Sequence, residues 1–285
     1  MSGTALDRLR RRREAIGAPL CLGIDPHPDR LPAELTRDVA GIETFARGLI
    51  EAAVAQAAAV KINVAFFEAF GSAGVAALER VRGDVPEDTV CILDAKRGDI
   101  GSTAERYAAA LFGILRADGV TLSPYLGEDA IEPFLAYPGR LVYVLARTSN
   151  PSASRVQDLA TDDGPVHLRV ARWAAERWSD GSVGLVVGAT APEELARVRA
   201  AVPGPGFLVP GVGAQGGDLG AALRACDGAW APGVVNVSRG IAQASTDDDW
   251  RSAAAAAASA VRERMGEAVL HSFASPAPAA NHGGS

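Results

Sequence analysis

The stretch VCILDAKRGDIGSTAERYAAA (Val90–Ala110) shows most plainly how the chain is built. It begins with an apolar run, Val90–Lys96, which predicts a buried β-strand. The periodic pattern that follows predicts a helix over Thr103–Ala117. A short apolar strand followed by a helix is the unit of an α/β protein, in which helices cover parallel strands.

Similar units recur on both sides of this stretch, and together they predict eight parallel strands. The expected strands are Pro19–Asp25, Val60–Ala65, Val90–Lys96, Val120–Ser123, Leu141–Arg147, Val183–Gly188, Phe207–Gly211 and Val234–Ser238. The expected helices are Ile42–Ala58, Ser72–Arg82, Thr103–Ala117, Val166–Trp178, Pro192–Ala200, Asp218–Ala225 and Asp247–Val269, with a shorter connection near Glu128–Tyr137.

The length of 285 residues leaves two organisations open, two domains of about 150 residues or one (β/α)₈ barrel of about 250. Eight units favour a single closed TIM barrel of the α/β class, with an open doubly wound sheet as the alternative. We predict an N-terminal helical extension at residues 1–17, the catalytic barrel at 18–270 and a flexible tail at 271–285. A polar insertion, Pro151–Gly164, follows the fifth strand.

The composition excludes several classes of protein. Hydrophobic residues make up 48% and charged residues 22%, as in an ordinary folded chain. The net charge of −6 argues against a general nucleic-acid or anionic-membrane binder. Three cysteines without a CxxC pair, no apolar run near 20 residues and no signal-peptide core predict a cytoplasmic protein.

The N-terminal segment carries a basic run, Arg10–Arg13. Leu6, Leu9 and Ile16 fit one face of a short helix. The run is therefore interpreted as the solvated face of that helix.

Charged residues interrupt three consecutive strands, although an unpaired ion on a buried strand costs several kcal/mol. Asp25 ends the first strand, Lys61 lies in the second, and Asp94 and Lys96 lie in the third. Neighbouring barrel strands would bring them into an array of alternating sign. Each has a structural alternative, such as a turn at Asp25 or an ion pair of Asp94 with Lys96. The C-terminal strand ends of a barrel, however, are where its active site lies.

A second constellation combines the glycine-rich PGVGAQGGD (Pro210–Asp218), after the seventh strand, with Arg239 at the end of the eighth. Glycines allow the backbone N–H groups to approach an anion, and arginine binds phosphate through paired donors. The loops after these two strands commonly bind phosphate in such barrels. The pattern predicts a phosphate site, with a tight turn and a surface arginine as the alternative.

Metal and cofactor signals are weak. The four histidines have no metal-ligand spacing, and no nucleotide-cofactor motif is present. Asp94 and Asp99 could hold Mg²⁺, but Lys61 and Lys96 would repel a cation. The residues therefore give little support to a metal site or to a nucleotide cofactor.

The segment LDAKRGDIGSTAERYA (Leu93–Ala108) resembles the signature of the orotidine 5′-phosphate decarboxylase family, in its longer bacterial branch. The similarity continues in the family's order through five other segments. They are CLGIDPHP (Cys21–Pro28), VKINVAFFE (Val60–Glu68), RTSNP (Arg147–Pro151), FLVPGVGAQGGD (Phe207–Asp218) and VNVSRGI (Val235–Ile241).

The resemblance implies a homodimer of (β/α)₈ barrels that converts orotidine 5′-phosphate to UMP and CO₂ in de novo pyrimidine biosynthesis, without metal or cofactor. It implies that Lys96 gives the proton to C6 and stabilises the charge there, with Asp94 beside the departing carboxylate. Asp25 and Lys61 would bind the ribose hydroxyls, and Lys61 would also order the charged array.

The resemblance also implies the remaining substrate contacts. Each subunit would complete its partner's site, and Ser149 would contact the pyrimidine. The residues expected from the partner are Asp99, Ile100 and Thr103, and those expected around the phosphate are Pro210, Val212, Gln215, Ser238 and Arg239. No nucleic acid or membrane is expected as a partner.

Two other functions remain open at this point. A Mg²⁺-dependent sugar-phosphate decarboxylase or aldolase would share the D-x-K-x-x-D core (Asp94–Asp99), but such relatives carry an acidic metal ligand where this chain has Lys61. A non-catalytic binding barrel would have no need of the charged positions, which are all present.

Overall fold

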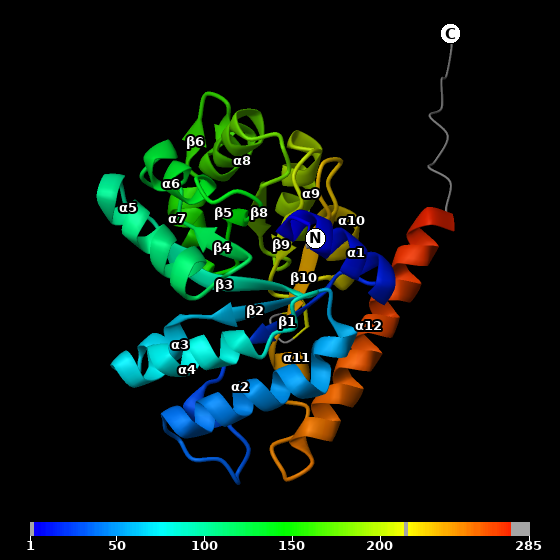
Figure 1. Cartoon of the computed structure of the whole chain (residues 1–285). Coiled ribbons are helices and arrows are strands. Elements are labelled where there is room, and N and C mark those ends of the chain that lie inside the picture. Colours follow the sequence, from blue (N-terminus) through cyan, green and yellow to red (C-terminus); the bar gives the residue numbers. More distant parts are fainter. Residues whose placement is uncertain (1–2, 214–215, 275–285) are drawn as a thin grey trace.

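The computed structural model describes residues 3–213 and 216–274. Eight parallel strands close into a barrel in the order β1-β10-β9-β8-β5-β4-β3-β2, with helices outside them (Figure 1). The predicted barrel is confirmed and the open sheet is excluded. The expected tail beyond Ala274 lies outside the described residues.

The predicted strands are all present, with ends that differ by no more than two residues. The barrel strands are β1 Leu20–Ile24, β2 Ala59–Asn63, β3 Val90–Arg97, β4 Gly119–Leu122, β5 Leu141–Arg147, β8 Val183–Val187, β9 Phe207–Val209 and β10 Val234–Val237. Almost all their residues are buried, which explains why they are continuous apolar runs.

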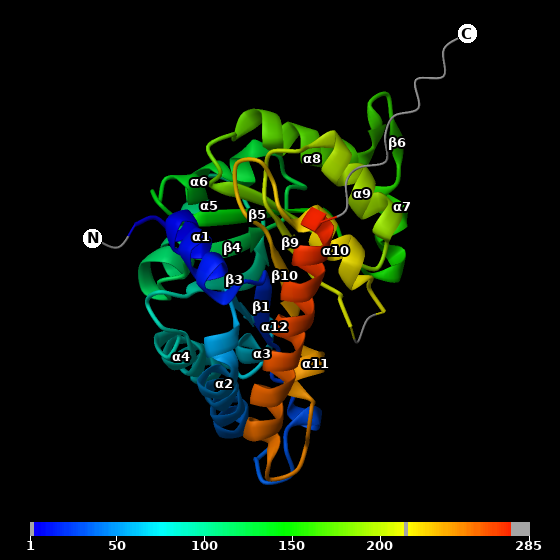
Figure 2. The same ribbon diagram turned by 90° about the vertical axis from the view of Figure 1, so that its right-hand side faces the viewer.

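The helices lie outside the strands. They are α1 Ala5–Ile16, α2 Val39–Ala53, α3 Ala65–Glu68, α4 Gly71–Gly83, α5 Gly101–Ala108, α6 Glu132–Leu135, α7 Ser154–Gln157, α8 Val166–Arg177, α9 Pro192–Ala201, α10 Leu219–Cys226, α11 Arg239–Ala242 and α12 Trp250–Ala274. Helix α5 continues as a π-helix, Ala109–Ile114. Helix α12 packs along α2 and extends past residue 271, where the tail was expected to begin (Figure 2).

Two apolar layers hold the barrel. One lies between the strands and the outer helices, and the other fills the barrel interior. Leu9 of α1 is fully buried in the inner layer with Cys21, Val90 and Tyr143. Helix α1 therefore closes the N-terminal mouth of the barrel, opposite the strand ends that carry the charges.

The arginines of α1 are not simply a solvated face, so that interpretation is wrong for two of them. Arg12 donates to the carbonyls of Ala57 and Val54 at 3.1 and 3.0 Å. Arg13 pairs with Asp227. Both side chains are about 15% exposed. They bind the loops at the base of the barrel, which sequence periodicity could not show.

The polar insertion after β5 is an ordered structure of its own. It contains a 3₁₀ turn, Pro151–Ala153, helix α7 and a small antiparallel hairpin of β6 (Ala160–Thr161) with β7 (Gly164–Pro165). The insertion packs against α8 and lies beside the end of β5.

Candidate active site

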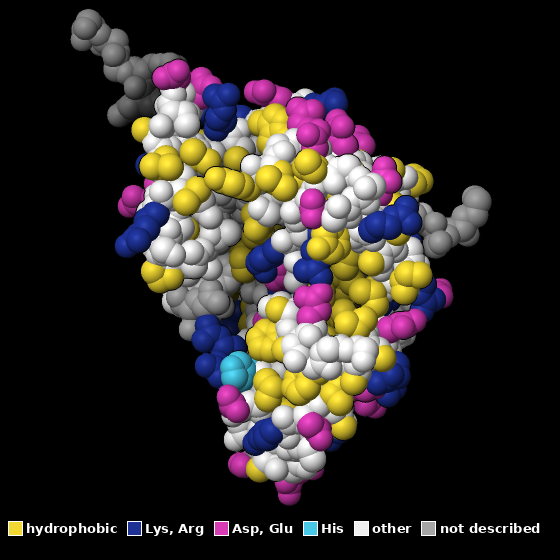
Figure 3. All heavy atoms as spheres, turned by 90° about the vertical axis from the view of Figure 1, so that its left-hand side faces the viewer, with side chains coloured by type: hydrophobic (Ala, Val, Ile, Leu, Met, Phe, Trp, Pro, Cys, Tyr) yellow, Lys and Arg dark blue, Asp and Glu magenta, His cyan; other side chains and the backbone are white. Residues whose placement is uncertain are grey.

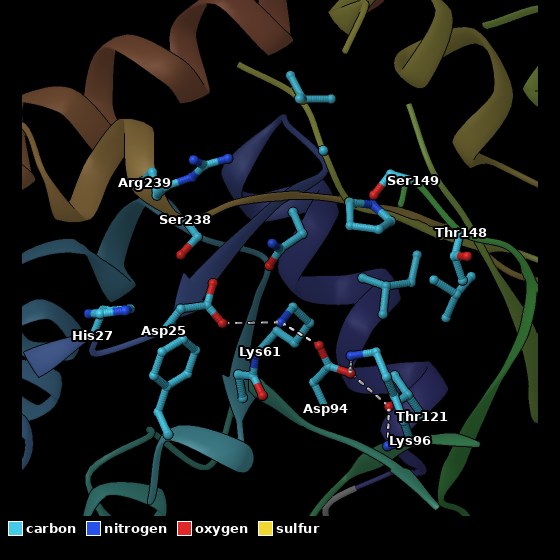
Figure 4. Close-up of a pocket in the computed structure, with 18 of the residues that line it drawn as sticks. Asp25, His27, Lys61, Asp94, Lys96, Thr121, Thr148, Ser149, Ser238 and Arg239 are labelled. Atoms are coloured by element: carbon cyan, nitrogen blue, oxygen red, sulfur yellow. Dashed lines mark hydrogen bonds and ion pairs between the residues drawn. The ribbon is translucent and has the colours of Figure 1, made fainter. Parts of the chain in front are cut away.

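A cleft of about 480 Å³ opens at the C-terminal ends of the barrel strands. It gathers predicted residues from the ends of six strands, although they lie far apart in the sequence (Figure 4). The predicted residues that line it are Asp25, Lys61, Asp94, Lys96, Ser149, Pro210, Val212, Ser238 and Arg239.

The four charged strand residues form a continuous row of alternating sign (Figure 4). The Nζ of Lys61 lies 3.8 Å from Oδ1 of Asp25 and 2.9 Å from Oδ2 of Asp94. The Nζ of Lys96 lies 2.5 Å from Oδ1 of Asp94. Lys61 is buried, whereas the side chain of Lys96 is 50% exposed to the cleft. The inner lysine is therefore enclosed by carboxylates, and the outer ammonium is accessible to a ligand.

Mutual pairing keeps this row charged. Burial, the largest influence, acts to lower the pKa of Lys61, but the carboxylates of Asp25 and Asp94 outweigh it and the pKa is raised. Burial likewise acts to raise the pKa of Asp94, but Lys61 and Lys96 outweigh it and the pKa is lowered. Near neutral pH, Lys61 is thus an ammonium and Asp94 a carboxylate.

Thr121 of β4 belongs to the row and was missed in the sequence. Its hydroxyl donates to Oδ1 of Asp94 at 2.9 Å and accepts the backbone N–H of Lys96 at 3.0 Å. A threonine on an apolar strand is an ordinary β-branched residue, so no signal distinguished it from a packing position.

The far end of the cleft carries the residues that the sequence predicts to bind a phosphate. Arg239, at the start of α11, lies across the cleft from Lys96 (Figure 4). Ser238 lies beside it, and its Oγ has no hydrogen-bond partner among the described residues. Gly211 has φ of 97° and Gly213 has φ of 80°, a region that only glycine adopts freely. The predicted Gln215 lies outside the described residues.

Strand β1 approaches this end closely through a glycine. A Cβ added to Gly23 would lie 2.7 Å from Cβ of Ser238 and 3.0 Å from Oδ1 of Asn236. Any side chain there would displace the residues beside Arg239. The glycine in CLGID therefore serves the site as well as the barrel.

The third side of the cleft is formed by the end of β5 and the segment after it. Thr148 and Ser149 line it with the apolar side chains of Leu145 and Val186. Gln157 of α7 fixes this segment, since its Oε1 accepts the N–H of Thr148 at 2.9 Å and its Nε2 donates to the Thr148 hydroxyl at 2.8 Å. The insertion thus supports the wall that holds Ser149.

Several further cleft residues had not been singled out. They come from the segments after β1, β2, β5 and β10 or from strand positions that are polar without being charged. These residues are His27, Arg30, Asn63, Phe66, Thr121, Thr148, Asn236 and Gln243.

The residues expected to serve a partner subunit do not line the cleft of their own chain. Asp99, Ile100 and Thr103 lie where β3 leads into α5, and Ile100 is 52% exposed. Figure 3 shows the side of the molecule that carries α3 and α5, where hydrophobic side chains surround Lys and Arg side chains.

No group of three or more His, Cys, Asp or Glu side chains in residues 3–213 and 216–274 is arranged to hold a metal ion. Nor does the described part of the chain contain a helix long and apolar enough to cross a membrane. The three cysteines are buried free thiols.

Comparison with known proteins places this arrangement in a family. Residues 18–256 match the sequence model of the orotidine 5′-phosphate decarboxylase / HUMPS family. The chain belongs to this family. An orotidine 5′-phosphate decarboxylase of Roseiflexus castenholzii is 49% identical over 253 residues, which cover 88% of this chain and 93% of that protein. The decarboxylase of Herpetosiphon aurantiacus is 44% identical over 92% of this chain and 94% of its own length.

Solved structures agree with the family and the barrel. The OMP decarboxylase of Leishmania donovani is 40% identical, with a TM-score of 0.82, and the match covers 94% of this chain and 99% of that one. A Toxoplasma gondii chain, also 40% identical, has a TM-score of 0.85 and is matched over 97% of its length. The family name covers both the decarboxylases and the HUMPS proteins. The relatives at 44–49% identity are named orotidine 5′-phosphate decarboxylase, which favours the decarboxylases as the nearer group.

Proposed function

We propose that this chain is a carboxy-lyase that converts orotidine 5′-phosphate to UMP and CO₂. The observation that carries the proposal is the cleft with an accessible ammonium, Lys96, at one end and a guanidinium, Arg239, at the other. The substrate has a carboxylate on its pyrimidine and a phosphate on its ribose, so its two anionic groups match these cations. The named relatives support the same activity.

In the proposed reaction the bond between C6 and the carboxylate carbon breaks, CO₂ leaves, and the electron pair remains on C6. The ammonium of Lys96 stabilises this developing negative charge and then transfers a proton to C6. The products are UMP and CO₂, and the lysine recovers its proton from solvent. Its 50% exposure provides a route for that recovery.

Asp94 has two roles in this scheme. Its carboxylate holds the Lys96 ammonium at 2.5 Å, which orients the proton donor. The substrate carboxylate would lie beside Asp94, and the repulsion between them would be relieved as CO₂ departs. Lys61 keeps Asp94 ionised, and together with Asp25 it would bind the ribose hydroxyls.

Phosphate binding would take place around Arg239 and Ser238, with the backbone at Pro210 and Val212 on the other side. The position of the reacting carbon would be set by this distant contact, because the substrate is held at both ends. Binding energy from the phosphate then contributes to the chemical step.

We further propose a homodimer in the cytoplasm. Asp99, Ile100 and Thr103 would enter the partner's cleft, since they lie outside the cleft of their own chain. Large apolar side chains are exposed on the elements around α5, as expected for a surface that pairs with a second copy. These side chains are Ile100, Tyr107, Ile114, Tyr125 and Leu126.

No metal takes part in the proposed reaction. Lys61 and Lys96 bracket Asp94 at 2.9 and 2.5 Å, so a divalent cation would have to displace an ammonium to reach this carboxylate. A metal-dependent relative of the family would need an anionic ligand at the position of Lys61.

The test is a spectrophotometric assay of the purified full chain with orotidine 5′-phosphate, with and without EDTA. We expect loss of substrate and formation of UMP at the same rate in both samples. A folded chain that forms no UMP would overturn the proposed activity. Activity that EDTA abolishes and Mg²⁺ restores would favour the metal-dependent alternative.

A further inference from the structure

The backbone of Lys96 has an unusual conformation for a proposed proton donor. Its φ is 46°, in the left-handed region that costs energy for a residue with a side chain. Such a conformation persists only where the surroundings hold it in place. The contacts around Lys96 should therefore identify the group that holds it.

The neighbouring strand register shows why the conformation arises. Leu93 pairs with Val120, and Arg97 pairs with Leu122. Between these two pairs β3 advances by four residues while β4 advances by two, so β3 contains a bulge. The bulge contains Asp94 and Lys96, and Thr121 is the β4 residue opposite it. A bulge interrupts the ladder hydrogen bonds and redirects side chains, which is why bulges are frequent beside active sites.

Thr121 replaces the interrupted ladder with its side chain. Its Oγ1 accepts the N–H of Lys96 at 3.0 Å, and its hydroxyl proton is donated to Oδ1 of Asp94 at 2.9 Å. The Thr121 oxygen accepts from the N–H of Lys96, and a hydroxyl has only one proton, which it donates to Asp94. The direction of both hydrogen bonds is therefore determined. Thr121 is also buried, so water does not compete for these bonds.

The same carboxylate oxygen receives the ammonium of Lys96 at 2.5 Å. Thr121 thus contacts Lys96 at its backbone, and at its ammonium through Asp94. We propose that Thr121 is a positioning residue of the decarboxylase site, whose hydroxyl fixes the Lys96 ammonium at the reacting carbon. This inference rests on the proposed function for its catalytic consequence, but its structural basis does not depend on that function.

The first test compares Thr121→Val, which keeps the shape and removes the hydroxyl, with Thr121→Ser, which keeps the hydroxyl. Thr89→Val is the matched control, because Thr89 is a buried threonine just before β3, at the opposite end of the barrel. If the valine variant does not fold, Thr121→Ala replaces it.

For Thr121→Val we expect kcat to fall about ten- to a hundredfold, the size of losing a hydrogen bond to a charged group. KM should change by less than about threefold, because the phosphate contacts remain. Thr121→Ser should retain kcat within about threefold, and Thr89→Val should lower the melting temperature without lowering kcat. Normal kcat in Thr121→Val, or equal loss in the serine variant, would overturn the proposal.

A crystal structure of Thr121→Val supplies a readout that needs no turnover. We expect Lys96 to leave the left-handed region or its Nζ to separate from Asp94. Unchanged positions of both residues would overturn the positioning role even if activity fell. If the unmodified chain formed no UMP, the proposed function would fail, and the crystal structure would still decide whether Thr121 holds Lys96.

Discussion

At the residue scale, the site depends on charges that stabilise one another. Lys61 is buried, yet it remains charged because two carboxylates face it. Asp94 is the centre of the row, since it contacts both lysines and Thr121. Removing Lys61 would leave Asp25 without its ion pair, and removing Asp94 would leave Lys96 without its own.

The lowered pKa of Asp94 predicts how stability responds to acid. A carboxyl group whose pKa is lower in the folded state than in the unfolded state stabilises the fold at pH values above its unfolded pKa of about 3.9. This stabilisation is lost as the pH falls toward the pKa of the folded state. From about pH 5 to about pH 3, the free energy of unfolding should therefore fall more steeply for the unmodified chain than for Asp94→Asn. Urea titrations across this range measure both slopes, and equal slopes would show that Asp94 is not stabilised as a carboxylate.

The charged members of the row could be predicted from sequence because a charge on a buried strand is conspicuous. Asp25, Lys61, Asp94 and Lys96 all line the cleft. Thr121 could not be predicted, because its importance depends on the bulge opposite it. The register shift between β3 and β4 arises from their pairing, and neither strand's own sequence carries a pattern that predicts it.

At the element scale, the strands were predictable and the short segments were not. Barrel strands are buried on both faces, so their apolar runs mark them directly. The π-helix Ala109–Ile114, the hairpin β6–β7 and helix α7 are too short for a periodic pattern. Their structure depends on contacts with distant parts of the chain, such as that of Gln157 with Thr148.

The insertion after β5 should influence substrate binding through Gln157. Gln157→Leu removes both hydrogen bonds to Thr148 and frees the segment that carries Ser149. We expect KM for orotidine 5′-phosphate to rise about three- to tenfold, while kcat changes less. Arg155→Ala, on the exposed side of the same helix, is the control. Steady-state kinetics that give Gln157→Leu the same KM as this control would remove Gln157 from the role.

Helix α1 should stabilise the barrel through Asp118, whose buried carboxylate pairs with Arg8, Arg82 and Arg140. Asp118→Asn leaves three arginines without their anion, and we expect a loss of roughly 3 kcal/mol of unfolding free energy. The exposed pair of Arg169 with Asp163 gives the control, since Asp163→Asn should cost less than about 1 kcal/mol. Chemical unfolding measures both, and similar small losses would contradict this account of α1.

At the scale of the whole molecule, the contacts of α1 that stabilise the barrel and the charged cleft lie at opposite ends of the barrel. Helix α1 and its arginines close the N-terminal mouth, and the charged cleft opens at the other end. The total length and composition could not show this division, because 22% charged residues is an ordinary value. The order of the strands and the places where charges interrupt them predicted the charged cleft at the C-terminal strand ends, but not the role of α1 at the opposite end.

The proposed dimer shares its active sites, so two inactive variants should complement each other. Each proposed site takes Lys96 from one subunit and Asp99 from the other. Lys96→Ala and Asp99→Ala therefore remove residues that different subunits supply to the same site. In a hybrid dimer, one site receives both substitutions and the other receives neither. Random exchange makes half of the dimers hybrid, so equal mixing should restore about a quarter of the activity of the unmodified chain. Inactivity of the mixture, after subunit exchange has been demonstrated, would contradict the shared site.

The central claim is that the cleft decarboxylates orotidine 5′-phosphate with Lys96 as the proton donor. The most direct measurement follows release of labelled CO₂ from carboxyl-labelled substrate, together with UMP, for the unmodified chain and Lys96→Ala. We predict one CO₂ for each UMP, and a rate at least about a thousandfold lower in the variant, which should remain folded and still bind UMP. No CO₂ from the folded, unmodified chain, or a variant nearly as fast, would contradict the account.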